Sequence, residues 1–276
     1  MFKNGLLALV TLFLIGSYSW GASESKPGYA VTCSSSIEKG ENEELSFDNS
    51  GVNIWNPEND PNSASVYLTE HARVAGLDAW KDLEVLDSEI RALTEMANDE
   101  ALIRDVGLGT GRSLEYLSRE YPHTYIEALD INRAAVEFAR IRFLKQSSRI
   151  NILEKNVLRD PLERKATVTL LMWSLMSEFD PASQKNLLQK LYRESQENAL
   201  VVVEMPSGFV PGTQKKQERW GFNQVEGING EILKLYISHP EEIVSWGRDV
   251  GFDRVEQKSY RTSTSYDRDI YLFYKD

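Results

Sequence analysis

The sequence predicts an α/β fold whose core is a mostly parallel sheet covered by helices. Residues 167–173 and 199–204 are continuous apolar runs, as expected of strands that are buried on both faces. Between them, residues 183–192 place apolar side chains at helical spacing. Strands that alternate with helices form βαβ units, and these units build parallel sheets.

A glycine-dense turn follows the first predicted strand of this sheet. Gly107, Gly109 and Gly111 are separated by single residues, and Asp105 precedes them. Glycine tolerates positive φ and lets a ligand approach the backbone closely. A dinucleotide-binding turn would carry its third glycine at position 112, which is Arg112 here. The spacing therefore disfavours NAD, and an acid beside the turn favours a ligand that brings an amine or hydroxyls.

The next predicted strand, residues 124–130, ends in a second acid, Asp130, nineteen residues after Gly111. An acid at about this distance holds ribose hydroxyls in nucleotide-binding βαβ units. The turn, Asp130 and the helical run at residues 131–140 together resemble the class I S-adenosylmethionine-dependent methyltransferases. The resemblance implies a Rossmann-like fold, with a seven-stranded, mostly parallel sheet, an antiparallel last strand and helices on both faces.

The resemblance extends over roughly residues 88–276 and implies S-adenosyl-L-methionine as cofactor. Asp105, Gly107, Gly109 and Gly111 would bind its methionine end, and Asp130 its ribose. Asn156 follows a third predicted strand, residues 149–157, where family members often carry an Asp that contacts adenine. The Asn156 carbonyl can accept the same hydrogen bond, or the residue can serve a turn. Residues 240–250 predict a helix closed by Gly251, and residues 252–260 and 270–275 predict the last two strands.

Residues that contact the methyl acceptor are expected in loops at the carboxyl ends of the strands. Glu178 and Glu204 lie in such loops and are candidates to orient or deprotonate an acceptor amine or hydroxyl. The alternative for both is a strand-end carboxylate bound to nearby N–H groups. Residues 205–235 interrupt the alternation of strands and helices and are a candidate substrate lid.

Other functions remain open at this stage. We expect methyl transfer to a small molecule or a protein side chain by in-line displacement. One alternative is an exported binding protein that kept the fold without catalysis. Another is an aminopropyltransferase-like enzyme, although residues 173–178 lack the aspartates that such enzymes carry after the fourth strand.

The amino-acid composition limits which molecules this protein can be expected to bind. A net charge of −11 and a pI near 5.0 argue against a nucleic-acid substrate, which needs a basic face. Basic residues do gather within residues 133–149, where we interpret them as a solvated helix face. Three scattered histidines predict no metal site. The oligomeric state and the acceptor atom are not readable from the sequence.

The N-terminus has the pattern of an export signal. Lys3 precedes an apolar run at residues 5–16, and small residues follow at Ser19 and Gly21, so that cleavage is expected near Gly21 or Ala22. We predict a signal peptide at residues 1–22, with an uncleaved membrane anchor as the alternative. Residues 23–65 form a polar, poorly ordered arm in this interpretation, and residues 66–276 form the methyltransferase-like domain. The protein is then periplasmic, secreted or delivered to another cell.

Export can be tested with a reporter fused after Asp276. The full-length chain should place the reporter outside the cytosol, and mass spectrometry should find the product without its first twenty or so residues. An uncleaved chain whose domain is protected from external protease would show an anchored enzyme that faces the cytosol instead.

Overall fold

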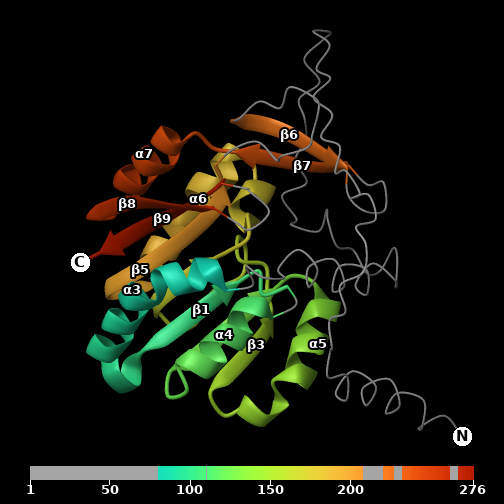
Figure 1. The fold of residues 1–276 in the computed structure, drawn as a ribbon, viewed down its shortest axis with the longest axis vertical. Coiled ribbons are helices and arrows are strands. Elements are labelled where there is room, and N and C mark those ends of the chain that lie inside the picture. Colours follow the sequence, from blue (N-terminus) through green and yellow to red (C-terminus); the bar gives the residue numbers. More distant parts are fainter. Residues whose placement is uncertain (1–79, 110, 208–219, 227–231, 262–266) are drawn as a thin grey trace, which may run out of the picture. The chain divides into compact units, whose positions relative to one another are not determined.

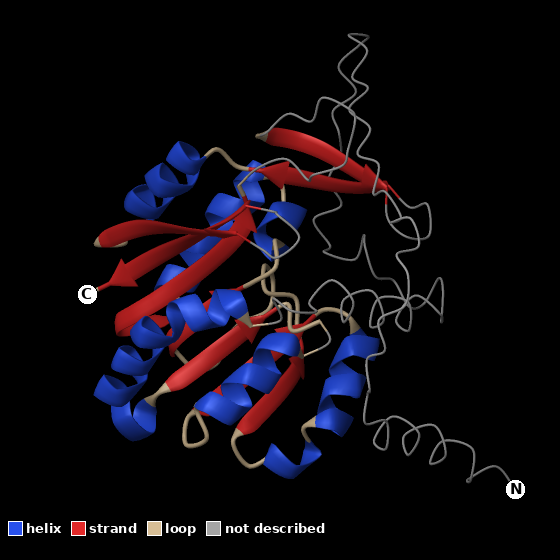
Figure 2. Ribbon diagram, viewed as in Figure 1, coloured by secondary structure: helices blue, strands red, loops and turns tan. Residues whose placement is uncertain are grey.

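The computed structural model describes residues 80–109, 111–207, 220–226, 232–261 and 267–276. The predicted signal peptide, the polar arm and residues 66–79 lie outside this part of the chain. The described residues form one seven-stranded sheet with helices on both faces, and a separate two-stranded sheet (Figures 1 and 2).

The large sheet has the strand order β3-β2-β1-β4-β5-β9-β8. Its parallel part pairs β1 with β2 and β4, β2 with β3, and β4 with β5; β9 is antiparallel to both β5 and β8. The chain starts at β1 in the middle, runs to one edge and returns at β4, so that the order reverses between β1 and β4. Ligands bind at this reversal in open α/β sheets. The strands are β1 (Leu102–Val106), β2 (Tyr125–Asp130), β3 (Ile150–Glu154), β4 (Ala166–Leu171), β5 (Ser195–Pro206), β8 (Arg254–Arg261) and β9 (Asp267–Lys275).

Helices cover the two faces because β-strand side chains alternate between them. Leu200 and Val202 of β5 belong to an apolar cluster with α3, α4 and α5, whereas Val201 and Val203 belong to a second cluster with α6 and α7. Each face of the sheet thus has its own core. The helices are α3 (Lys81–Ala97), α4 (Arg112–Glu120), α5 (Arg133–Arg142), α6 (Pro181–Arg193) and α7 (Pro240–Val250).

The predicted seven-stranded fold with its antiparallel last strand is confirmed. The helix at 240–250 has the predicted limits, and Gly251 ends it with φ +113°, in the left-handed region that glycine favours. The third strand ends at Glu154, shorter than the predicted 149–157, because Asn156 begins a turn. Helix α3 starts at Lys81, ahead of the expected beginning of the family resemblance near Ser88.

The candidate lid includes a β-hairpin. Its described parts are β6 (Gly221–Glu226) and β7 (Ile232–Ile237), which pair antiparallel, while residues 208–219 and 227–231 lie outside the described residues. Gln184 of α6 fastens the hairpin by donating to the Tyr236 carbonyl at 3.0 Å and accepting from the Ser238 hydroxyl at 2.6 Å. His239 then caps α7. This attachment places the hairpin beside the loop that follows β4.

Within the described residues, the helices are too short or too polar to span a bilayer.

Close packing of α7 on the sheet gives the first structural prediction. A Cβ at Gly247 would lie 2.6 Å from two ring carbons of Phe273 and 2.9 Å from Val255. Because Phe273 is fully buried, Gly247→Ala should lower the free energy of unfolding by about 1–3 kcal/mol in urea denaturation. Arg248→Ala on the same helix is the control, and equal stability of both variants would contradict this packing.

Candidate active site

The glycine turn joins β1 to α4 at the carboxyl end of the sheet. Gly107, Gly109 and Gly111 have φ values of +70°, +50° and +79°, so all three occupy the left-handed region. A Cβ at Gly107 would lie 2.8 Å from Leu175, a residue of the short helix η4 (Leu175–Glu178) that follows β4. The turn therefore needs glycine both for its backbone conformation and for the approach of η4.

Asp130 lies at the end of β2 and is tied to the glycine turn. Its two carboxylate oxygens accept hydrogen bonds from the backbone N–H groups of Gly109 and Asn132, each at 2.8 Å. Burial raises the pKa of Asp130, and these N–H donors oppose the increase. Asn132 in turn caps α5. The structure thus brings together the two predicted halves of the cofactor site, the glycine turn and the strand-end acid.

Asp105 is buried beneath this turn, with 1% of its surface exposed. Its Oδ2 atom accepts no hydrogen bond from the part of the chain that the structure describes. Burial raises the pKa of Asp105 to about 7; Arg112 lowers it, while the nearby carboxylates of Asp130 and Asp82 raise it further. A buried carboxylate in this condition is stabilised by any cation that reaches it.

Asn156 adopts the turn role in this structure. Its side-chain carbonyl accepts from Leu158 N at 2.9 Å, and its backbone N–H donates to Asp160 at 2.7 Å. The carbonyl oxygen has a second lone pair. Adenine contact by Asn156 therefore stays a prediction.

Glu178 and Glu204 have different environments. Glu178 is partly exposed, and burial, together with the charge of Asp130, raises its pKa to about 8. Glu204 is 0% exposed; one oxygen accepts from Trp173 N and the other from Arg268 Nε at 2.9 Å and from the Tyr260 hydroxyl. Burial alone would raise the pKa of Glu204, but Arg268, Tyr260 and Arg112 hold it below its usual range. Glu204 is thus fixed in place by its donors, whereas Glu178 keeps its proton to a higher pH than an ordinary glutamate.

The loop after β4 begins with a strained pair of residues. Trp173 and Ser174 have φ values of +54° and +68°, which cost side-chain-bearing residues roughly 1–2 kcal/mol each. Glu204 accepts from the backbone of Trp173, and Arg268 donates to the Ser174 hydroxyl at 2.7 Å. The Arg112 guanidinium lies 4.7 Å from the centre of the Trp173 ring. Two buried side chains, Glu204 and Arg112, and the partly buried Arg268 therefore hold this turn in place.

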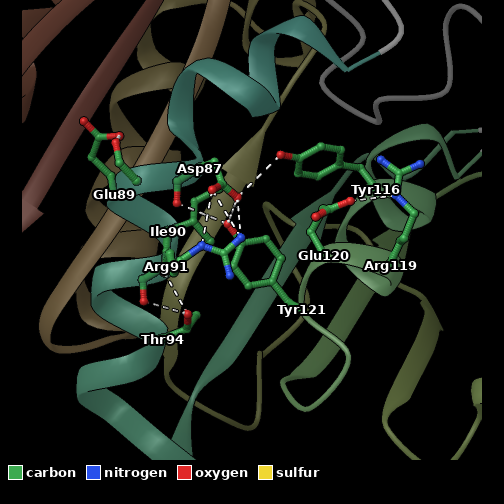
Figure 3. Close-up of polar contacts among 10 residues, drawn as sticks. Asp87, Glu89, Ile90, Arg91, Thr94, Tyr116, Arg119, Glu120 and Tyr121 are labelled. Carbon is green, nitrogen blue, oxygen red and sulfur yellow. Dashed lines mark hydrogen bonds and ion pairs between the residues drawn. The ribbon is translucent and has the colours of Figure 1, made fainter.

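Arg112 is itself held by Asp82 of α3. The pair is bidentate, with N–O distances of 2.8 Å and 2.6 Å, and both side chains are buried. A second contact connects α3 to α4: Asp87 accepts from the Tyr121 hydroxyl at 2.7 Å and pairs with Arg91 (Figure 3). Helix α3 thus closes one side of the site and fixes the guanidinium above Trp173.

Four residues of this arrangement are absent from the sequence-based prediction: Asp82, Arg112 as a structural cation, Tyr260 and Arg268. Only Arg112 had a local signal, because it replaces the third glycine of a dinucleotide motif. The others reach the site through pairing of strands and helices distant in sequence. A metal site is not formed among the His, Cys, Asp and Glu residues of the described ranges. The basic residues of 133–149 make local contacts, such as that of Arg140 with the Ile152 carbonyl at 2.8 Å.

Comparisons with known proteins agree with this geometry. Residues 103–198 match the family model of a methyltransferase domain. No curated protein sequence matches the chain. Among solved structures, S-adenosylmethionine-bound CalS10, an amino pentose methyltransferase from Micromonospora echinaspora, is 16% identical with a TM-score of 0.52; the match covers 73% of this chain and 94% of CalS10.

Two further neighbours show the range of this fold. PigF, solved with S-adenosylhomocysteine, is 16% identical with a TM-score of 0.56, over 83% of this chain and 63% of PigF. SpnF is described as a [4+2]-cyclase and is 14% identical with a TM-score of 0.50, over 68% of this chain and 80% of SpnF. The fold alone therefore does not determine the reaction.

The predicted resemblance to the class I S-adenosylmethionine-dependent methyltransferases is confirmed, because the family model matches and the described fold is similar to that of solved members. Residues 103–198 of this chain match a methyltransferase domain, and two of the structures that share its fold, CalS10 and PigF, were solved with S-adenosylmethionine and S-adenosylhomocysteine.

The buried pair of Asp82 and Arg112 gives a stability prediction. Asp82→Ala leaves the buried Arg112 guanidinium without its carboxylate, so the free energy of unfolding should fall by about 3–5 kcal/mol. Adding Arg112→Leu should recover part of that loss, because the buried charge is then gone. A cycle of single and double variants in urea measures the coupling, with Asp99→Ala as the exposed control. Strictly additive losses would show that the two side chains act independently.

Proposed function

We propose that this domain transfers the methyl group of S-adenosylmethionine to a nucleophilic atom of a small molecule or a protein side chain. The observation that carries the proposal is the buried Asp105 carboxylate, whose Oδ2 lacks a partner within the described structure, beside three left-handed glycines. The methionine end of the cofactor brings an ammonium group, which suits this carboxylate. The cofactor supplies an electrophilic methyl group, which an acceptor displaces in line.

In this proposal the other residues of the site have separate tasks. Asp130 would accept the ribose hydroxyls, since its oxygens keep lone pairs beyond those used by Gly109 and Asn132. Glu178, with a pKa near neutrality, would accept a proton from the acceptor amine or hydroxyl. Glu204 would hold the turn at Trp173 and thereby the wall of the acceptor site. Positioning of this kind supplies most of what methyl displacement requires from a protein.

The broad test is titration calorimetry of the chain without residues 1–22 against S-adenosylmethionine, S-adenosylhomocysteine and NAD. Binding of the first two and not the third supports the proposal. If neither S-adenosylmethionine nor S-adenosylhomocysteine binds, a non-catalytic protein that uses the same fold is favoured. Where the enzyme meets its cofactor depends on the N-terminus, and we propose export, supported by the sequence of residues 1–22.

Asp130→Ala should weaken S-adenosylhomocysteine binding by about 1.5–3 kcal/mol, the contribution of hydrogen bonds to a charged group. Calorimetry measures the change, circular dichroism checks that the variant is folded, and Asp99→Ala provides the control. An unchanged affinity in a folded Asp130→Ala protein would remove ribose binding from this residue.

Binding should also depend on pH through Asp105. The ionised carboxylate is the form that pairs with an ammonium group, and its pKa is raised to about 7. Below pH 7 binding must therefore release a proton, and affinity for S-adenosylhomocysteine should fall by up to about tenfold per pH unit. Above pH 7 this contribution levels off.

Calorimetry between pH 5.5 and 7.5, in buffers of different ionisation enthalpy, measures both the affinity and the released proton. Asp105→Asn should bind more weakly and with a much flatter pH dependence. A wild-type affinity that is constant over this range would contradict the assignment of Asp105 to the ammonium group.

A further inference from the structure

An apolar strip lies on the outer surface of α5 and the short turn after it, η3 (Leu144–Gln146). Phe138, Ile141 and Leu144 are 41%, 67% and 68% exposed. They are three of the six large apolar side chains that are exposed among the described residues, and they fall within seven positions. Clustered exposed apolar side chains mark a contact surface. We refer to residues 133–149 as the α5 surface.

The α5 surface is basic in an acidic protein. It holds five cations and one acid, Glu137, while the whole chain carries −11. Two cations are fixed on opposite sides of the helix, since Arg140 donates to the Ile152 carbonyl of β3 and Arg142 pairs with Glu115 of α4. These contacts leave the guanidinium groups charged and hold them beside the apolar strip. The cations are Arg133, Arg140, Arg142, Lys145 and Arg149.

A complementary segment occurs in the same chain, before the described domain. Residues 41–48 read Glu-Asn-Glu-Glu-Leu-Ser-Phe-Asp, with four acids and no base. Leu45 and Phe47 are two positions apart, so an extended backbone would present both on one face. The residues between 48 and 80 can span up to about 100 Å when extended, so chain length does not restrict where the segment reaches.

We propose that residues 41–48 dock on the α5 surface, with Leu45 and Phe47 against Phe138, Ile141 and Leu144. The acids of the segment then face the cations beside the strip. Docking within one chain has a high effective concentration, so a small interface suffices. A second molecule or an anionic bilayer would also meet the cations, but each would approach against the net charge of −11.

The docking site adjoins the cofactor turn. Arg142 Nη1 lies 3.9 Å from where a Cβ of Gly111 would be, and Phe143 lies 3.0 Å from the same point. A segment seated on the α5 surface therefore borders the glycine turn and extends the protein beyond the described domain on that side.

The test is photo-cross-linking in the full chain. The protein has one cysteine, Cys33, so Cys33→Ser with Ser46→Cys gives a single site for a benzophenone label. Mass spectrometry should find the cross-links concentrated on peptides of residues 133–149. Ile141→Ser with Lys145→Glu should lower their yield about fivefold, because both the apolar and the charged contacts are weakened. The yield should also fall at high salt.

Reversing one charge on the α5 surface and one in the segment distinguishes specific docking from nonspecific labelling of an exposed surface. Lys145→Glu alone should lower the yield, and Lys145→Glu with Glu44→Lys should restore it. Lys185→Glu is the matched control, because Lys185 is an exposed cation on α6, against the opposite face of the sheet. Cross-links spread over the surface, or insensitive to Lys145→Glu, would overturn the proposal. Cross-links only between two chains, or only after addition of phosphatidylglycerol vesicles, would assign the α5 surface to those partners instead.

Discussion

Charge matching at the carboxyl ends of the strands is the constraint on which the rest of the site depends. A carboxylate removed from water must meet a cation or hydrogen-bond donors, or else take up a proton. Glu204 meets Arg268, and Asp82 meets Arg112, so these acids stay in buried ion pairs. Among the residues that the structure describes, Asp105 and Glu178 have no such ion pair, and burial raises their pKa values to about 7 and about 8. The matched acids stabilise the folded structure, whereas the unmatched acids are the ones to which we assign the cofactor and the acceptor in the proposed function.

The same constraint explains the strained turn at Trp173 and Ser174. A left-handed backbone without glycine persists only where its surroundings determine it fully. Here the ring of Trp173, its backbone N–H and the Ser174 hydroxyl each meet a different charged group, and two of these groups are buried. The three groups come from α4, β5 and β9, so the turn is determined by the folded sheet as a whole. A change in any one of these three elements is therefore expected to alter the backbone of the turn at Trp173 and Ser174.

Sequence reasoning succeeded where the signal is local. The glycine turn, Asp130 and the strand–helix alternation depend on neighbours in the chain, and the structure has them where they were predicted. The two glutamates show the limit. Glu178 and Glu204 look equivalent as strand-end acids, but Arg268 lies 64 positions from Glu204 and reaches it only through the pairing of β5 with β9. The role of α3 was missed for the same reason, since Asp82 meets Arg112 across 30 positions.

The position of β9 in the sheet also determines when the sheet can be completed as the chain is synthesised. This strand lies between β5 and β8, yet residues 267–275 leave the ribosome after every other described element. Until they arrive, β5 has an open edge and Glu204 lacks Arg268, so the last strand to be made completes both the sheet and the charge pairing at its carboxyl ends.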